Sequence, residues 1–383
     1  MPEVLLNPWY RPSYRTAAVP PDPRTVHRRL PGYAPTPLRD LAPLADRWGL
    51  GRVWLKDESH RLGLPAYKVL GAAWAVSRVL EQRYGPLGEW RDLAGLRARL
   101  APHPPLRLVT ATDGNHGRGV ARMAHWLGWP AEVYLPAGSA AARLEGIRSE
   151  GARVIEVYGT YDEAVTRAAR AAEAPGALLL QDHGWEGYEQ VPAWVAEGYE
   201  TIFAEVDEAL AAAGEPGPDL VLVQVGVGTL ASAAVRHFRR EGLGRPPRLA
   251  GVEPTGAACA LRSIAAGAPV MLEVGAHASI MAGLNCGTPS SAAWPDLREG
   301  IDAWVAVEDA RAEEAMRVLA ALGVVAGESG AAGLAGLMEL MAGADAATRA
   351  RLGLGPGARV LVLSTEGATD PAGWERVVGR PPA

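Results

Sequence analysis

The sequence contains very little lysine. Its 38 basic residues divide into 36 Arg and only 2 Lys, Lys56 and Lys68, and the 383 residues include only three Asn. A coding sequence rich in G and C drifts towards Ala, Arg, Gly and Pro, and the 45 Gly and 31 Pro fit that drift. The drift explains the scarcity but not the two exceptions. Unlike arginine, lysine can become a nucleophilic amine and form a Schiff base when desolvation lowers its pKa, so we expect chemistry from at least one of them.

Other absences exclude whole classes of function. Cys259 and Cys286 are too few for a disulfide framework or a zinc site, and composition alone favours two buried thiols. A net charge of −5 without a basic stripe argues against nucleic acid or an anionic membrane as partner. The apolar runs are shorter than a bilayer requires, and MPEVLLNPWYRPSYR lacks the pattern of a signal peptide. We therefore expect a cytoplasmic protein without a metal.

The two lysines have different surroundings. ESHRLGLPAYKVLGAAW (58–74) places Lys68 directly before an apolar run, where it opens a helix that faces inward. An ordinary lysine prefers water, so this position is unusual. Lys56 is followed by Asp57 and Glu58 at the end of a strand, which favours a structural ion pair.

Strands and helices alternate along most of the chain, whose length favours two domains. A Pro- and Arg-rich arm over residues 1–50 includes one helical pattern at Pro37 to Trp48. The expected strands are 52–56, 107–112, 131–137, 152–158, 177–182, 219–226, 248–254, 303–308 and 358–365. The expected helices are 69–83, 117–127, 140–150, 161–172, 229–240, 309–322 and 330–341. The pattern predicts an α/β protein with parallel sheets that helices cover on both faces.

Ligands bind such sheets at the carboxyl ends of the strands, which directs attention to the following turns. After strand 107–112, DGNHG places Asp113, Asn115 and His116 at the mouth of a helix, whose N-terminus attracts anions. An N-cap is the ordinary role for Asp113, but the turn has one more polar group than a cap requires. After strand 177–182, Asp182 lies near several aromatic residues. There it is either part of a surface loop or a general base with a raised pKa.

A glycine-rich turn follows strand 219–226. We expect this turn to form an anion cradle, in which backbone N–H groups hold a phosphate. Its residues are Gly226, Val227, Gly228, Thr229 and Leu230. The same G-x-G-x-x-A pattern, with an acidic residue at the end of the next strand (Glu253), also fits a dinucleotide fingerprint. The turn alone therefore leaves a nicotinamide cofactor open.

Strand 358–365 ends in LSTEGATD, where Ser364 or Thr365 offers a hydroxyl. One set of contacts to pyridoxal phosphate combines these groups: Lys68, Asn115, the glycine cradle and this hydroxyl. In this set Lys68 bonds the cofactor carbon, Asn115 the ring oxygen and Ser364 the ring nitrogen.

The combination resembles the fold type II pyridoxal-phosphate enzymes, the group of threonine deaminase and the tryptophan synthase β chain, and within it the diaminopropionate ammonia-lyases. The resemblance rests on KDESHRLGLPAYKVLGA (56–72), TATDGNHGRGVA (110–121), QDHGWEGYEQVPAW (181–194), VGVGTLA (225–231), IMAGLNCGTPS (280–290), ESGAAGL (328–334) and LSTEGATD (363–370). Other members usually have Ser or Ala at position 113, so the carboxylate there points to the ammonia-lyase branch. Tyr67 precedes the lysine where Phe is usual, and His183-Gly184 replaces the typical pair, which leaves the substrate in doubt.

The resemblance implies a larger cofactor-binding domain (1–75 and 216–383), a smaller α/β domain (76–215) closing over the site, and a homodimer. It implies α,β-elimination from 2,3-diaminopropionate to pyruvate and two ammonia. Asp113 would take the proton from the D form and Asp182 from the L form. It also matches Cys259 and Cys286 to positions that can form a disulfide near the entrance of the site.

Three alternatives remain. The first is a lyase acting on serine or threonine, which would release one ammonia per keto acid. The second is a nicotinamide-dependent dehydrogenase that uses GVGTLA. The third is a homologue that binds the cofactor without turnover.

Overall fold

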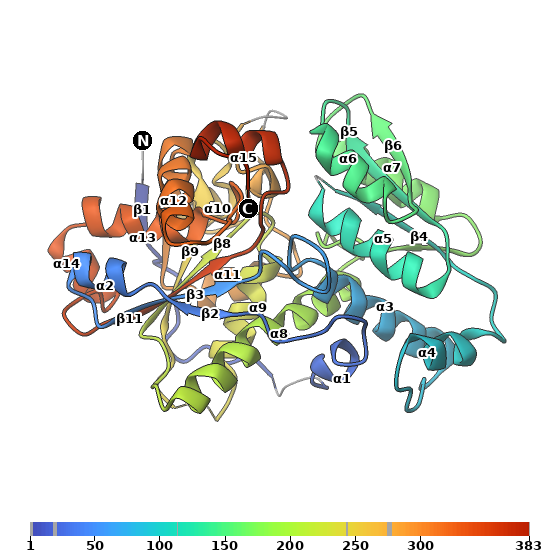
Figure 1. Cartoon of the computed structure of the whole chain (residues 1–383), viewed down its shortest axis with the longest axis horizontal. Coiled ribbons are helices and arrows are strands. Elements are labelled where there is room, and N and C mark those ends of the chain that lie inside the picture. Colours follow the sequence, from blue (N-terminus) through green and yellow to red (C-terminus); the bar gives the residue numbers. More distant parts are fainter. Residues whose placement is uncertain (1–2, 18–20, 113, 243, 274–277, 383) are drawn as a thin grey trace.

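The computed structural model describes residues 3–17, 21–112, 114–242, 244–273 and 278–382. It is an α/β structure with two separate sheets, which lie on the left and right of Figure 1. The strands are β1 (Glu3–Leu6), β2 (Leu38–Asp40), β3 (Arg52–Asp57), β4 (Arg107–Ala111), β5 (Ala131–Pro136), β6 (Arg153–Val157), β7 (Ala177–Leu179), β8 (Leu220–Gln224), β9 (Arg248–Pro254), β10 (Ala303–Val307) and β11 (Arg359–Ser364).

The larger sheet has seven strands in the order β1-β10-β9-β8-β11-β3-β2. Its five inner strands are parallel, and the edge strands β1 and β2 are antiparallel to their neighbours. Every residue of β8 and β10 is buried, as expected for strands that helices cover on both faces. The smaller sheet is parallel throughout, in the order β6-β5-β4-β7.

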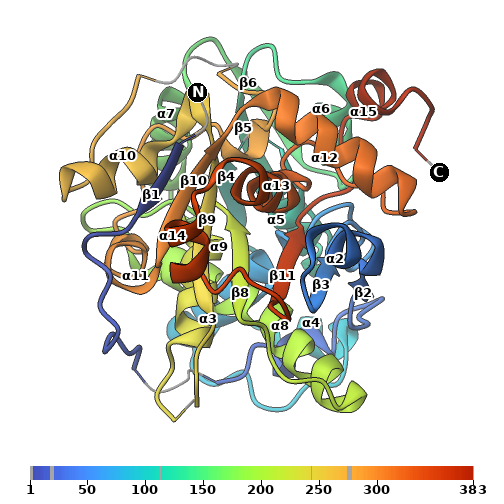
Figure 2. The same ribbon diagram turned by 90° about the vertical axis from the view of Figure 1, so that its left-hand side faces the viewer.

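Helices cover both sheets. They are α1 (Arg24–His27), α2 (Ala42–Trp48), α3 (Val69–Tyr84), α4 (Leu93–Leu100), α5 (Asn115–Leu127), α6 (Ala141–Arg148), α7 (Tyr161–Ala172), α8 (Gln190–Ala213), α9 (Thr229–Phe238), α10 (Cys259–Ala266), α11 (Trp294–Gly300), α12 (Asp309–Ala321), α13 (Ala332–Gly343), α14 (Ala346–Arg351) and α15 (Pro371–Val378), with 3₁₀ turns at η1 (Thr255–Ala257) and η2 (Ala282–Leu284). Figure 2 shows α12 and α13 in front of the larger sheet, and α9 packs on strands β8 and β9 of that sheet. None of the helices in the described ranges is long and apolar enough to cross a membrane.

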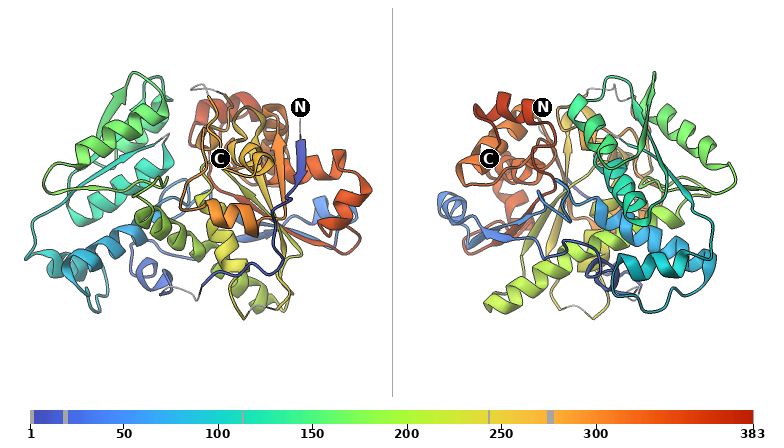
Figure 3. Two further views of the ribbon diagram at one scale, coloured as in Figure 1. Left: turned by 180° about the vertical axis from the view of Figure 1, so that it is seen from behind. Right: turned by 45° about the vertical axis from the view of Figure 1, so that its right-hand side comes forward.

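Helices α3 and α8 pack tightly together between the two sheets (Figure 3). Two glycines make the close approach possible. A Cβ added to Gly198 would lie 2.7 Å from Leu70 O, and a Cβ added to Gly71 would lie 2.5 Å from the Tyr199 ring. This contact fixes the start of α3, and therefore Lys68, relative to both sheets.

The structure confirms the predicted alternation of parallel strands and helices, but one local prediction was wrong and one long helix was not predicted. The stretch 37–48 is not one helical pattern, since β2 precedes α2 and pairs with β3. The loop that follows Asp182 leads into α8, a helix of 24 residues that the sequence analysis did not identify. Its apolar residues bury against α3 and α9, so no single apolar stripe marks it.

Candidate active site

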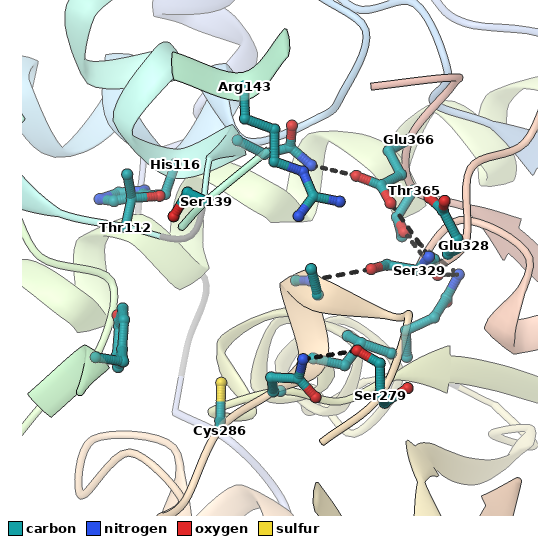
Figure 4. A pocket seen from close by; sticks show the side chains of 18 of the residues that line it. Thr112, His116, Ser139, Arg143, Ser279, Cys286, Glu328, Ser329, Thr365 and Glu366 are labelled. Carbon is teal, nitrogen blue, oxygen red and sulfur yellow. Dashed lines mark hydrogen bonds between the residues drawn. The ribbon is translucent and has the colours of Figure 1, made fainter. Parts of the chain in front are cut away.

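A cavity of about 410 Å³ is lined by residues from both sheet-containing parts of the chain. The smaller sheet contributes residues that follow β4 and β5, and the larger sheet contributes residues that follow β8 and β11. This is the position expected for a ligand in parallel α/β sheets, at the carboxyl ends of the strands. Figure 4 shows Arg143 and His116 on one side of this space and Glu328, Thr365 and Glu366 on the other.

Lys68 lies at the start of α3, and its side chain is 19% exposed towards the cavity. Its Nζ donates a hydrogen bond of 2.6 Å to Asp182 Oδ2. Gly119 of α5 lets that helix pass close to this point, because a Cβ there would lie 3.0 Å from Val69 N. Burial by itself would lower the pKa of Lys68, but the Asp182 carboxylate raises it well above its usual value. The pKa of Lys68 is therefore raised, whereas desolvation alone was expected to lower it.

Asp182 is buried at the end of the segment that follows β7. Its main-chain oxygen accepts a hydrogen bond of 2.6 Å from Thr229 Oγ1, which joins it to the start of α9. Burial would raise the pKa of Asp182, but the positive charge of Lys68 and its hydrogen bond to Oδ2 hold it below its usual range. The raised pKa predicted from the neighbouring aromatic residues is therefore wrong, because the sequence does not show that Lys68 Nζ donates to this carboxylate.

The glycine-rich turn lies on the cavity wall as expected, since Gly226, Val227, Gly228, Thr229 and Leu230 all line it. Gly228 has φ 97°, and a Cβ there would lie 2.5 Å from Leu297 Cδ1. Only glycine adopts this conformation without strain. The turn leads directly into α9, whose first backbone N–H groups have no partner within the helix. The arrangement suits an anion such as a phosphate.

Asn115 is the first residue of α5 and lines the cavity. Its Nδ2 donates a hydrogen bond to Glu366 Oε2, which joins α5 beside the smaller sheet to the segment after β11 of the larger sheet. The second oxygen of Glu366 accepts a bond of 3.1 Å from Ser329 N. Glu366 was part of a quoted motif, but the sequence analysis gave it no role.

The hydroxyl at the end of β11 that faces the cavity belongs to Thr365. Ser364 is fully buried and pairs with Asp57 in the sheet, whereas Thr365 lines the cavity. Thr365 Oγ1 lies 3.4 Å from both Ser329 O and Gln224 Nε2. Which hydroxyl meets a cofactor ring was left open from the sequence, and this placement favours Thr365 over the named Ser364.

Asp113 lies outside the residues that the structure describes, so its predicted role stays a prediction. The turn is held on both sides of it, because Thr112 Oγ1 accepts hydrogen bonds from Gly114 N (2.9 Å) and Gly117 N (3.1 Å). Arg143 and Glu328 also line the cavity and were not identified from the sequence. Burial raises the pKa of Glu328 to about 7. No motif marks Arg143, which belongs to the short helix α6.

Both cysteines lie close to Gly226. Cys259 Sγ is 3.6 Å from Gly226 O, and a Cβ on Gly226 would lie 3.1 Å from Cys286 Sγ. They are not joined by a disulfide in the structure. The disulfide implied by the resemblance thus remains a prediction.

The dinucleotide reading of the glycine-rich turn depends on Glu253, which would have to reach a ribose. Glu253 is fully buried, and its carboxyl oxygens accept hydrogen bonds from Ala260 N (2.8 Å) and Leu261 N (2.7 Å) at the start of α10. This carboxyl group is therefore engaged as a helix cap and does not face a ligand.

Pyridoxal phosphate fits the groups that line the cavity. It requires an amine for its carbonyl carbon, an anion cradle for its phosphate, and polar side chains around its ring. The amine is Lys68 Nζ, and the anion cradle is the turn at Gly226–Leu230. The polar side chains around the ring are those of Asn115 and Thr365. Gly226 and Gly228 leave no room for a side chain, because a Cβ would lie 3.0 Å from Gly283 O and 2.5 Å from Leu297 Cδ1, respectively. No cluster of metal-ligating side chains occurs among the described residues.

Comparisons with known proteins agree with this reading. The model of the family "Pyridoxal-phosphate dependent enzyme" matches residues 29–366. The chain is 40% identical to diaminopropionate ammonia-lyase of Salmonella typhimurium over 92% of this chain and 90% of that one, and 37% identical to the Escherichia coli K12 protein over 93% and 90%. The structure matches that of the Escherichia coli diaminopropionate ammonia-lyase in complex with D-serine, with a TM-score of 0.91, 34% identity, and coverage of 99% and 97%. The predicted fold is thereby confirmed as fold type II, and the chain belongs to the family of pyridoxal-phosphate dependent enzymes.

Proposed function

We propose that the protein is a pyridoxal-phosphate dependent ammonia-lyase that converts 2,3-diaminopropionate to pyruvate and two ammonia. The observation that carries the proposal is the cavity in which Lys68 Nζ lies 2.6 Å from Asp182 Oδ2, on the same wall as the glycine-rich turn. Identity of 40% to a diaminopropionate ammonia-lyase over nearly the whole chain supports this choice of substrate.

The cofactor would be held by Lys68, Asn115, the turn at Gly226–Leu230 and Thr365. When bound, pyridoxal phosphate withdraws electrons from the α-carbon of an attached amino acid and so makes the α-hydrogen acidic. The protein must then supply a base, hold the substrate in position and exclude water.

Asp182 is our proposed base for the L enantiomer, and Asp113 our proposed base for the D enantiomer. Asp182 Oδ2 faces the lysine amine, where an amino-acid substrate would be attached, and takes the α-hydrogen as a proton. The electron pair of the broken C–H bond forms the Cα–Cβ double bond, and the β-amine, which carries its own proton as an ammonium group, leaves as ammonia with the electrons of its C–N bond. Lys68 then displaces the product, and water converts the released enamine to pyruvate and a second ammonia. General-base catalysis contributes about 10² to 10⁴-fold.

The two separate sheets support a division of the chain into two domains. We propose a larger cofactor-binding domain of residues 1–75 and 216–383 and a smaller domain of residues 76–215 that closes over the cavity. The homodimer and the cytoplasmic location stay predictions, and sedimentation of the purified protein would measure the oligomeric state.

The experiment compares the two lysines. The wild type, purified with pyridoxal phosphate, should show a visible absorbance band and release pyruvate from 2,3-diaminopropionate. Lys68→Ala should lose both the band and the activity, whereas Lys56→Ala should keep the band. An unchanged spectrum in Lys68→Ala would contradict the assignment of the cofactor to this cavity.

A further inference from the structure

His116 faces the Asp182 carboxylate with one ring nitrogen. It is the second residue of α5, and its side chain is 3% exposed. Nε2 lies 2.8 Å from Leu180 O, and Nδ1 lies 3.7 Å from Asp182 Oδ2. Within the part of the chain that the structure describes, Nδ1 has no hydrogen-bond partner although it is buried. A buried polar atom without a partner is costly, so its presence in a site calls for an explanation.

The partners of the ring determine where its proton lies. A carbonyl oxygen only accepts, so Nε2 must carry the hydrogen that is donated to Leu180 O. Burial lowers the pKa of His116, which keeps the ring neutral at pH 7. Nδ1 is therefore an unprotonated acceptor that faces a second acceptor, the ionised Asp182. The separation of 3.7 Å is longer than a hydrogen bond and fits two acceptors that share no proton.

This contact becomes favourable when Asp182 gains a proton, because an O–H at Oδ2 can donate to Nδ1. Other groups near Asp182 among the described residues include Lys68 at the start of α3, Tyr199 of α8, Tyr188 and the neighbouring His183. Lys68 Nζ acts in the opposite sense, since its positive charge favours the ionised carboxylate. His116 is thus the neighbour placed to accept a hydrogen bond from a protonated Asp182.

We propose that His116 is a positioning residue for the elimination: its unprotonated Nδ1 orients Asp182 and accepts a hydrogen bond from Oδ2 after that oxygen has taken the α-hydrogen of the substrate as a proton. The proton stays on Oδ2, and no covalent bond to His116 forms. The C–H electrons go into the Cα–Cβ double bond as the β-amine leaves. This inference rests on the proposed role of Asp182 as a base.

The variant His116→Gln separates the two contacts of the ring. A glutamine amide nitrogen can reproduce Nε2 and donate to Leu180 O, but nothing in it replaces Nδ1 opposite Asp182. The chain offers a matched control in His27, which is also fully buried and also contacts a main-chain oxygen through Nε2, Leu70 O at 2.9 Å. His27 does not line the cavity.

Turnover of each enantiomer of 2,3-diaminopropionate tests the proposal. We expect His116→Gln to lower kcat about 10- to 100-fold for the enantiomer that Asp182→Asn impairs. Loss on the other enantiomer should stay below about threefold, and His27→Gln should lower both equally or neither. Equal losses on the two enantiomers in His116→Gln would mean a structural role for His116 and overturn the proposal.

Nitrogen-15 NMR of the histidines in the protein without cofactor gives a second readout, independent of turnover. The resonances lost in His116→Gln should show a protonated Nε2 and an unprotonated Nδ1. In Asp182→Asn the new amide can donate to Nδ1, whose resonance should move towards the hydrogen-bonded range. A proton on Nδ1 in the wild type would overturn the proposal. If the protein failed to convert diaminopropionate at all, the proposed function would fall, while this NMR result would still decide the contact.

Discussion

At the scale of single residues, the two lysines differ in what surrounds their charge. Lys56 is fully buried and donates to Glu205 Oε2 at 2.6 Å and to Thr36 O at 2.8 Å. Arg61 donates to the same glutamate, so the charges compensate each other inside the protein. Lys68 has one carboxylate partner and an open side towards the cavity. The predicted structural ion pair of Lys56 is confirmed, although its main partner is Glu205 of α8 and not a neighbour in sequence.

Replacing Lys56 tests this division of roles. We expect Lys56→Met to lower the free energy of unfolding by about 3–5 kcal/mol, because one buried carboxylate loses a compensating charge. Urea denaturation of the protein would measure it. Arg153→Met is the control, since Arg153 forms an exposed pair with Glu132 and should cost less than about 1 kcal/mol. A cost for Lys56→Met as small as that of the control would contradict the buried network.

The two aspartates predict opposite stereochemical effects. Asp182→Asn should lower kcat for L-2,3-diaminopropionate about 10²-fold or more, because the general base is lost. Asp113→Asn should do the same for the D enantiomer. Chiral substrate assays measure both, and similar losses on the two enantiomers in either variant would reduce that aspartate to a structural role.

Single residues also mark the limit of what sequence can predict. Lys68 could be identified because it breaks the composition of the chain. Glu366 could not, since it lies 251 residues from Asn115 and only the fold brings them together. His116 was visible within DGNHG, but its contact with Asp182 depends on how α5 and the segment after β7 approach each other.

At the scale of elements, the start of α9 joins several parts of the site. Its cradle residue Gly228 has a left-handed conformation, and Thr229 Oγ1 holds the Asp182 main chain. Most strands could be predicted from their apolar runs, whereas α8 could not, because its residues are buried by two different helices. Turn chemistry and apolar periodicity are local signals, but helix-to-helix burial is not.

Gly228→Ala tests the cradle. The added Cβ would clash with Leu297 Cδ1 in a conformation that alanine rarely adopts, so the turn must shift. We expect the affinity for pyridoxal phosphate to fall at least about tenfold in an absorbance titration. Gly323→Ala is a matched control: Gly323 has φ 76° but open space around its Cβ position, so strain alone should leave the affinity unchanged. Equal affinities in the two variants would contradict the cradle assignment.

At the scale of the whole molecule, several carboxyl groups are so deeply buried that the neutral, protonated form of the acid is favoured. Burial raises the pKa of Glu253 from 4.5 to about 8 and that of Glu200 to about 7. In the folded protein these groups hold a proton that the unfolded chain releases near pH 4.5. Their contribution to stability is therefore present below pH 4.5 and is lost as pH rises through 7 to 8.

This sign predicts that the contribution of Glu253 and Glu200 to the free energy of unfolding falls between pH 5 and pH 9. Glu253→Gln replaces the neutral acid with a neutral amide of the same shape, so the fall should be smaller in this variant. Urea midpoints measured across that range provide the check. Parallel curves for the wild type and Glu253→Gln would show that Glu253 keeps its ordinary pKa in the folded protein.

The ratio of ammonia to pyruvate tests the central claim most directly. The purified protein with pyridoxal phosphate is supplied with 2,3-diaminopropionate, serine and threonine in separate assays, and both products are measured. We predict pyruvate from diaminopropionate with two ammonia for each pyruvate. Turnover of serine or threonine with one ammonia per keto acid, and none of diaminopropionate, would contradict it.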